Sequence, residues 1–266
     1  MKSYISFLAL TFIIGSIAFS GCSKSITDNA SLKFQKKSFA KAFDSTNTKT
    51  DNYVHVKIDY VVFTQAKTKV VKDSLNKIVE SYISAPIFEQ KTKTLVELAQ
   101  SLIDDYKKQK KEFPDFPGGY ELERNVEVLY SNDKLVCVKF NEYSFFGGAH
   151  PNSVMFYTNV DLQTGRMIKL EELFVDGYKE RLNKIAEKYF RRERELKPDE
   201  DLEQAGFWFD GNKFSVNENF AIQKSGLSFY FNDYEVTSHA TGPTLIEIPF
   251  AELNSIIKPS GYISTK

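Results

Sequence analysis

The order of hydrophobic patterns along the chain restricts its fold more than any other feature. Residues 52–63 alternate between apolar and polar side chains, with one apolar face made of Val54, Val56, Ile58, Tyr60 and Val62, which predicts a half-buried strand. Two stretches with helical spacing follow, at residues 67–84 and 92–113, and the prolines of "FPDFPGG" end the second because proline cannot continue a helix. Two more alternating runs flank Ser131–Asp133, a turn signal, and predict a hairpin over residues 120–145.

The rest of the chain mixes strands and helices without a regular order. "LQTG", at residues 162–165, separates two more short predicted strands, and residues 177–195 have the spacing of an amphipathic helix. A strand, a "KSG" turn and an aromatic strand occupy residues 219–236, and residues 243–257 contain a last strand and a short helix. Because strands and helices do not strictly alternate, the sequence predicts an α+β fold, with antiparallel sheets and packed helices, and not a doubly wound sheet.

The N-terminus has the layout of a secretory signal over residues 1–21. Lys2 precedes an apolar run from Tyr4 to Phe19, and the small residues Ser20 and Gly21 stand directly before Cys22. This layout resembles a bacterial lipoprotein signal, in which Cys22 becomes the lipidated first residue. The alternative is an uncleaved membrane anchor, but the apolar run is short of the ~20 residues that a spanning helix needs. We therefore expect an extracytoplasmic protein of the bacterial cell envelope, lipid-anchored to the outer membrane or the cell surface in a diderm.

Residues 22–50 are rich in Ser, Thr, Lys and Asn, which predicts a flexible tether with an end-to-end distance of ~30 Å. Residues 259–266 are predicted to be a short tail. The chain has 35 basic and 35 acidic side chains, so its charge gives no reason to expect nucleic acid as a partner. Once Cys22 carries lipid, Cys137 is the only cysteine left, and the core must hold the fold without an intramolecular disulfide.

Familiar catalytic motifs are absent from the sequence. It contains no G-x-S-x-G, H-E-x-x-H or Cys-x-x-Cys motif and no glycine-rich phosphate loop. A zinc site would have to combine His150 and His239 with a carboxylate, or recruit His55, which we expect to be a solvated strand residue. A Cys137–His150 dyad is the other candidate, although Cys137 lies in an apolar alternating run that favours an inert packing role. We therefore predict no catalytic residue, metal or cofactor.

The segment "SFFGGAHPNS", residues 144–153, predicts a stiff corner between two strands. Gly147 and Gly148 allow positive φ angles, and Pro151 pushes His150 toward an extended conformation. Asn152 can bond to nearby backbone and shape the turn. Two interpretations follow: His150 hydrogen-bonds within its own corner, or the corner presents it to a ligand or protein partner.

Three motifs carry a family resemblance: the GGAH corner, the D-x-x-T-G turn at Asp161–Gly165, and "FNDYE" at Phe231–Glu235. Together they resemble a pair of extracytoplasmic bacterial domains of unknown function. The pair is similar to the extracellular region of the anti-sigma factor RsiV and to the non-catalytic N-terminal region of the deacetylase PdaC. The resemblance implies two consecutive α+β halves, a PdaC-N-like domain at 51–160 and an RsiV-like domain at 161–258.

The resemblance also implies a non-catalytic, ligand- or protein-binding role in the envelope, with lysozyme-like hydrolases or peptidoglycan as the leading ligands. Two alternatives stay open: an envelope hydrolase acting on cell-wall glycan near His150 and His239, and a purely structural lipoprotein. The candidate binding residues are Phe145, Phe146, Gly147, Gly148, His150, Asn152, Tyr234 and His239.

Overall fold

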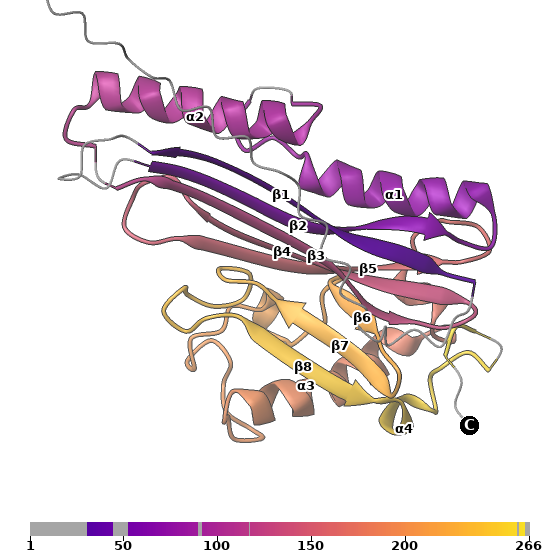
Figure 1. Ribbon diagram of the computed structural model, residues 1–266. Coiled ribbons are helices and arrows are strands. Elements are labelled where there is room, and N and C mark those ends of the chain that lie inside the picture. Colours follow the sequence, from indigo (N-terminus) through magenta and orange to yellow (C-terminus); the bar gives the residue numbers. More distant parts are fainter. Residues whose placement is uncertain (1–30, 45–52, 90–91, 117, 260, 264–266) are drawn as a thin grey trace, which may run out of the picture.

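A five-stranded sheet forms the N-terminal half of the molecule (Figure 1). The computed structural model describes residues 31–44, 53–89, 92–116, 118–259 and 261–263. The strands lie in chain order, and every neighbouring pair is antiparallel except β2 and β3, which are parallel because two helices connect them. The strands are β1 (Lys33–Asp44), β2 (Tyr53–Gln65), β3 (Tyr120–Ser131), β4 (Leu135–Phe145) and β5 (Asn152–Asp161).

The connecting helices α1 (Lys69–Ile83) and α2 (Leu95–Glu112) cover one face of this sheet (Figure 1). Thr68 and Thr94 cap their N-termini, and the second cap is a full capping box with Glu97. Both helices pack their predicted apolar stripes into a core that they share with the apolar face of the sheet, although Ile78, Tyr82 and Leu95 are only half-buried. In β2, burial follows the prediction at Val54, Val56 and Ile58 but then moves to Val61 and Phe63, beyond the segment that pairs with β3.

The prediction of a flexible tether over residues 22–50 is wrong for its central part. Residues 33–44 form strand β1, which pairs along its whole length with β2. Phe34, Phe39 and Phe43 pack against the core, and the Phe34 ring meets that of Phe63 with centroids 5.9 Å apart. The lysine-rich, polar composition hid this strand, because an edge strand gains its stability from the backbone ladder and a few apolar contacts. Residues 22–30 and 45–50 lie outside the described part of the chain.

The C-terminal half is a three-stranded antiparallel sheet with helices and aromatic loops. The rings of Phe209, Phe214 and Phe231 surround the buried Phe190 on α3. The second strand predicted after "LQTG" shrinks to a single bridge between Val160 and Met167. The elements are η1 (Leu170–Glu172), α3 (Tyr178–Glu193), η2 (Asp210–Asn212), β6 (Phe220–Ile222), β7 (Gly226–Phe231), β8 (Thr244–Pro249) and α4 (Phe250–Leu253). The predicted α+β class, with two consecutive halves, is confirmed.

Asparagine side chains join the two halves along the free edge of β5. Asn232 accepts from the Met155 N–H at 2.7 Å and donates to the Met155 carbonyl at 3.0 Å. Asn219 accepts from the Tyr157 N–H in the same way, at 2.9 Å. Asn159, on β5 itself, bonds to the backbone of β6. These amides take the place of a sixth strand, so the polar edge is satisfied without continuing the sheet.

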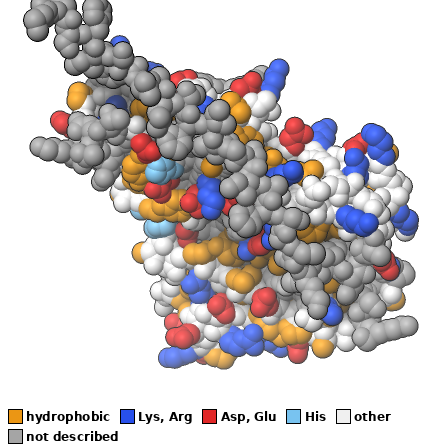
Figure 2. Space-filling view, viewed as in Figure 1, with side chains coloured by type: hydrophobic (Ala, Val, Ile, Leu, Met, Phe, Trp, Pro, Cys, Tyr) orange, Lys and Arg blue, Asp and Glu red, His pale blue; other side chains and the backbone are white. Residues whose placement is uncertain are grey.

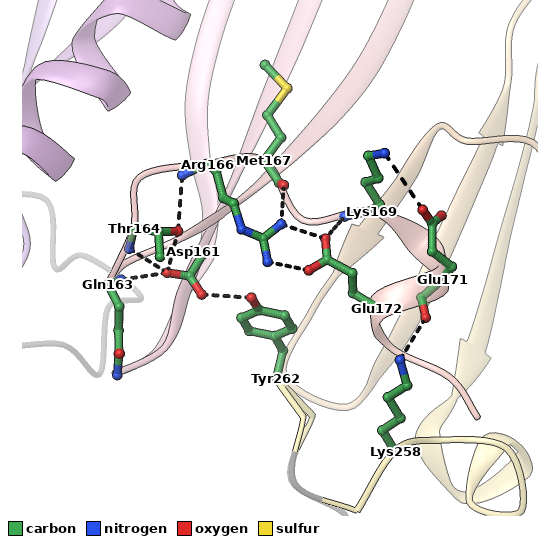
Figure 3. A network of polar contacts seen from close by, with 10 residues as sticks. All are labelled: Asp161, Gln163, Thr164, Arg166, Met167, Lys169, Glu171, Glu172, Lys258 and Tyr262. Carbon is green, nitrogen blue, oxygen red and sulfur yellow. Dashed lines mark hydrogen bonds and ion pairs between the residues drawn. The ribbon is translucent and has the colours of Figure 1, made fainter. Parts of the chain in front are cut away.

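A polar network at the D-x-x-T-G turn fixes the link between the halves (Figure 3). Asp161 accepts from the backbone N–H groups of Gln163 and Thr164, each at 2.7 Å, and from the Tyr262 hydroxyl at 2.7 Å. Burial acts to raise the pKa of Asp161, but the bonds from Tyr262, Thr164 and Gln163 outweigh it and hold that pKa below its usual range. Burial and the bond to Asp161 raise the pKa of Tyr262 to about 12. The predicted tail is thus anchored at Tyr262, and Ile263 is buried in the C-terminal core.

Candidate functional site

The GGAH corner connects β4 to β5 and has the conformation that its glycines suggested. Gly147 and Gly148 have φ angles of +82° and +109°. A Cβ atom on Gly147 would lie 2.5 Å from the Phe116 ring, so a larger residue does not fit there. Phe146 packs inward against Tyr120, with centroids 5.3 Å apart, contrary to the hypothesis that it faces a partner. The corner is therefore held from inside by aromatic rings.

The other predicted residues of this corner differ in exposure. Phe145 is half-buried at the end of β4, whereas Gly148 and His150 are exposed. Asn152 is also exposed and begins β5, where it pairs with Ser144. The His150 Nδ1 atom lies 3.1 Å from the Pro151 carbonyl oxygen. The corner thus fixes the backbone of His150 and leaves much of its ring accessible.

The "FNDYE" stretch forms a tight turn directly after β7. Asn232 anchors it to β5, and the Asn232 N–H donates to the Glu235 carboxylate at 2.8 Å. Tyr234 has a φ angle of +62°, in the left-handed region that a bulky side chain rarely adopts. Its side chain is 55% exposed. Strain of this kind persists only where the surroundings impose it, and it is common at functional surfaces.

These two loops bring three of the predicted residues together, and we call His150, Tyr234 and His239 the His/Tyr cluster. The imidazole rings of His150 and His239 stack with centroids 4.2 Å apart and planes inclined by 16°. The Tyr234 ring stacks on His239 at 5.6 Å, and its hydroxyl lies 3.3 Å from Nε2 of His150. In Figure 2, histidine atoms lie beside hydrophobic and acidic atoms toward the left edge of the visible face. His150 therefore contacts the C-terminal half of the chain. The sequence left two interpretations open, a histidine bonded within its own corner and one presented to a partner, and the observed arrangement lies between them.

Asp233 is a fourth member of this site that sequence reasoning missed. Its Oδ2 atom lies 3.2 Å from Nδ1 of His239, and its side chain is only 9% exposed. Its other oxygen, Oδ1, is buried without a hydrogen-bond partner in the part of the chain that the structure describes. A carboxylate on Nδ1 orients an imidazole and leaves Nε2 free to act as an acceptor. The only sequence signal for Asp233 is its place directly before Tyr234.

Trp208, the single tryptophan of the chain, extends the aromatic surface beside this turn. It is 51% exposed, and its indole N–H donates to the Glu235 carbonyl at 3.2 Å. The neighbouring backbone is held too, since the Trp208 N–H donates to the Val236 carbonyl. An exposed indole fixed by its own hydrogen bonds loses little conformational entropy when a partner covers it.

Other potential catalytic groups do not join the cluster. Cys137 is fully buried in the middle of β4, and burial raises the pKa of its thiol, so the hypothesis of a Cys137–His150 dyad is wrong. His55 is exposed on β2, as predicted, and pairs with Asp44 of β1 at 2.9 Å. Among the described residues, no three His, Cys, Asp or Glu side chains are grouped so that they could hold a metal ion.

The membrane-related predictions concern residues outside the described ranges. The signal segment 1–21 and the lipidation candidate Cys22 both lie there. Within the described ranges, no helix combines the length and the apolar character that crossing a membrane requires.

Comparison with known families matches the two halves to two different domains. Residues 47–153 match a family described as deacetylase PdaC, and residues 171–251 match a protein family of unknown function, DUF3298. The chain is 25% identical over 182 residues to the peptidoglycan-N-acetylmuramic acid deacetylase PdaC of Bacillus subtilis (strain 168). That alignment covers 66% of this chain and 38% of the relative, so the chain spans well under half of the relative's length.

Solved structures of DUF3298 proteins share the fold. A member from Bacteroides fragilis superposes with a TM-score of 0.68 at 22% identity, over 85% of this chain and 94% of the other. A member from Pseudomonas aeruginosa PAO1 gives a TM-score of 0.61 at 20% identity, over 85% and 95%. The predicted pairing of a PdaC-like domain with a domain of unknown function is confirmed. The further likeness to RsiV stays a prediction.

Proposed function

Because this chain carries a PdaC-family domain followed by a DUF3298 domain, we propose that it is a lipid-anchored protein of the bacterial cell envelope whose folded body binds a ligand without transforming it. The leading ligands are peptidoglycan fragments and lysozyme-like hydrolases. The name of the Bacillus subtilis relative supports the first, since that protein is a deacetylase of peptidoglycan N-acetylmuramic acid. The resemblance to RsiV supports the second.

The observation that carries the proposal is the stacking of His150 on His239. This contact places Tyr234, and with it the anchored Trp208, on a surface to which both halves of the chain contribute. Exposed Tyr and Trp side chains held in fixed positions are the residue types that contribute most energy at binding interfaces. A surface of this kind fits recognition better than chemistry, because its aromatic groups supply contact area and no nucleophile.

Calorimetry and pull-down assays with soluble muropeptides and with lysozyme test this proposal. The variants His239→Ala and Trp208→Ala should each weaken binding about tenfold or more, the loss that corresponds to one well-packed aromatic contact. The matched control is His55→Ala, which removes an exposed histidine from β2. If neither ligand binds at high micromolar concentration, both named ligands are eliminated; if binding survives both variants, the His/Tyr cluster is not the contact surface.

Lipid anchoring has its own test. Replacing Cys22 with Ser should move the protein from the membrane fraction to the soluble fraction and abolish labelling by a radioactive fatty acid. A Cys22→Ser variant that stays with the membrane would point to the uncleaved anchor instead.

An envelope hydrolase is the second candidate, and the Asp233–His239 contact favours it. An imidazole oriented by a carboxylate can serve as a general base if a substrate reaches its free nitrogen. Mass spectrometry of muropeptides and cell-wall glycan after incubation separates the two proposals. Product that disappears in Asp233→Ala would establish the enzyme; binding without product would support recognition alone. A purely structural lipoprotein would bind neither ligand and would co-purify with other membrane components.

A further inference from the structure

A polar cleft of about 370 Å³ lies on the side of the large sheet that α1 and α2 do not cover. The C-terminal half packs beneath β4 and β5 in Figure 1 and contributes Tyr230 from β7 as one wall. Its size lies within the range of small-molecule sites, which are usually largely preformed. The lining residues used below are Lys57, Asp59, Glu123, Asn125, Asn141 and Tyr143.

The strand register arranges the cleft side chains in two rows across the sheet. In the first row, Lys57 pairs with Glu123, and Glu123 pairs with Tyr143. In the second row, Asp59 pairs with Asn125, and Asn125 pairs with Asn141. Paired residues point to the same face of a sheet, so each row is a continuous line of polar side chains. Strands β2, β3 and β4 hold these rows, and β5 lines the cleft beside them, which makes the surface rigid.

A buried ion pair on the opposite face of the sheet, toward α1, fixes the strands that form the floor of the cleft. Arg124 donates to the Glu142 carboxylate at 2.8 Å, and its Nη1 donates to three backbone carbonyls at the end of α1, those of Tyr82, Ile83 and Ala85. Arg124 is only 3% exposed. With Arg124 and Glu142 paired, the charges left at the surface are one lysine against two carboxylates. A cleft that is so close to neutral does not suit a polyphosphate or a nucleic acid.

The remaining chemistry suits a carbohydrate. The two asparagine amides each offer donors and an acceptor, which match sugar hydroxyl and acetamido groups. The Tyr143 and Tyr230 rings provide apolar faces. Desolvation and the Glu121 and Glu123 carboxylates raise the pKa of Tyr143. Desolvation and the negative charge of Asp233 raise the pKa of Tyr230. Both phenols therefore stay protonated and can donate hydrogen bonds. The Nζ atom of Lys57 lies 3.4 Å from Oδ2 of Asp59, and the same ammonium group is available to pair with a carboxylate on the ligand.

We propose that this cleft binds a chain of N-acetylated amino sugars, with the asparagine row contacting acetamido and hydroxyl groups and Tyr143 contacting a sugar ring. The inference rests on the proposed function and adds to the His/Tyr cluster a second, separate surface, which takes the glycan part of the cell-wall ligand. The two surfaces are neighbours in the chain, because Tyr230 and Tyr234 flank the Asn232 anchor.

Titration calorimetry with tetra-N-acetylchitotetraose, a soluble chain of N-acetylglucosamine, tests this inference on the intact protein. We expect Asn141→Ala and Tyr143→Ala each to weaken binding about tenfold or more. Glu123→Gln, which keeps the shape of the cleft, is the second variant if either alanine variant fails to fold. The matched control is Phe113→Ala, which removes an exposed ring from the C-terminal end of α2, outside both surfaces, and should leave chitotetraose binding within about twofold of the wild type.

The outcomes separate the two proposals. No binding of chitotetraose at millimolar concentration, or cleft variants that bind as the wild type does, overturns the assignment of the cleft. Loss of lysozyme or muropeptide binding in His239→Ala with intact chitotetraose binding supports two separate surfaces. Sugar binding that responds to Tyr234→Ala and not to Tyr143→Ala would move the sugar site to the cluster and overturn the inference while sparing the proposed function.

Discussion

The imidazole rings of His150 and His239 stack with their centroids 4.2 Å apart. One ring stands on the corner between β4 and β5 in the PdaC-type half, and the other on the loop between β7 and β8 in the DUF3298 half. The contact therefore reports directly on how the two halves dock. Since neither loop could place its histidine alone, any role of the cluster depends on this docking.

We expect the two histidines to be energetically coupled. In a double-mutant cycle with His150→Ala and His239→Ala, the coupling free energy should be about 0.5–1.5 kcal/mol, as found for stacked aromatic pairs. Urea unfolding of the four proteins at neutral pH measures it. A cycle between His55→Ala and His239→Ala is the control and should be additive within about 0.5 kcal/mol, because His55 contacts Asp44 and Tyr53 instead. Additivity in the first cycle would mean that the stack does not contribute to docking.

Asp233 should set the tautomer of His239. Its carboxylate faces Nδ1 at 3.2 Å, which favours a proton on that nitrogen. In Asp233→Ala we expect the population to move toward the Nε2–H form, visible in the imidazole nitrogen chemical shifts by NMR. The free energy of unfolding should change by less than about 1 kcal/mol, since the variant also removes an unpartnered buried oxygen. The spectrum of His55 is the internal control, and an unchanged His239 spectrum would contradict the assigned contact.

Arg124 should be among the most important polar residues for stability. Arg124→Met leaves the Glu142 carboxylate and three carbonyls at the end of α1 without their donor, at a cost of about 3–5 kcal/mol. Adding Glu142→Leu should recover only part of this, because the carbonyls stay unpaired. The matched control is Lys139→Met, which breaks a half-buried cross-strand pair with Glu127 on the same two strands and should cost less than about 1 kcal/mol. Urea unfolding measures both single variants. If Arg124→Met and Lys139→Met lose the same free energy of unfolding, the prediction that Arg124 contributes more to stability is wrong.

Local patterns in the sequence were enough to predict most elements of the fold. The periodicity of residues 67–84 and 92–113 corresponds to α1 and α2, and the turn at Ser131–Asp133 joins β3 to β4 as expected. Strand β1 was missed because its lysines mask the three phenylalanines that pack, and because its partner is recognised only through backbone pairing. An analysis of hydrophobic patterns considers side chains alone, so it does not detect an edge strand that is stabilised mainly by backbone pairing.

The candidate site was predictable residue by residue but not as an arrangement. His150, Tyr234 and His239 each stood out locally, through rarity or a motif, yet nothing in the sequence placed them in contact. Asp233 was passed over because it is one of 35 acidic residues, and its burial arises only when the two halves dock. The cleft depends on the register of four strands, which cannot be derived from composition. Long-range register is therefore the information that the local patterns lacked.

The turn at Asp161 should make stability depend on pH. Asp161 is buried, and its folded pKa lies below the unfolded value of about 4, so its contribution is fully present above about pH 4 and is lost as the pH falls through the folded pKa. Asp161→Asn keeps the shape but weakens the bonds from Tyr262, Thr164 and Gln163. At about pH 7 it should lower the free energy of unfolding by about 1.5–3 kcal/mol.

The difference between Asp161→Asn and the wild type should shrink as the pH is lowered toward about pH 2, because the wild-type carboxyl then becomes neutral as well. Urea unfolding at several pH values measures this. Glu171→Gln, which removes an exposed carboxylate near the same turn, is the control and should change stability by less than about 1 kcal/mol at every pH. A difference for Asp161→Asn that stays constant down to about pH 2 would mean that the asparagine acts through packing and that the charge of Asp161 does not hold the turn.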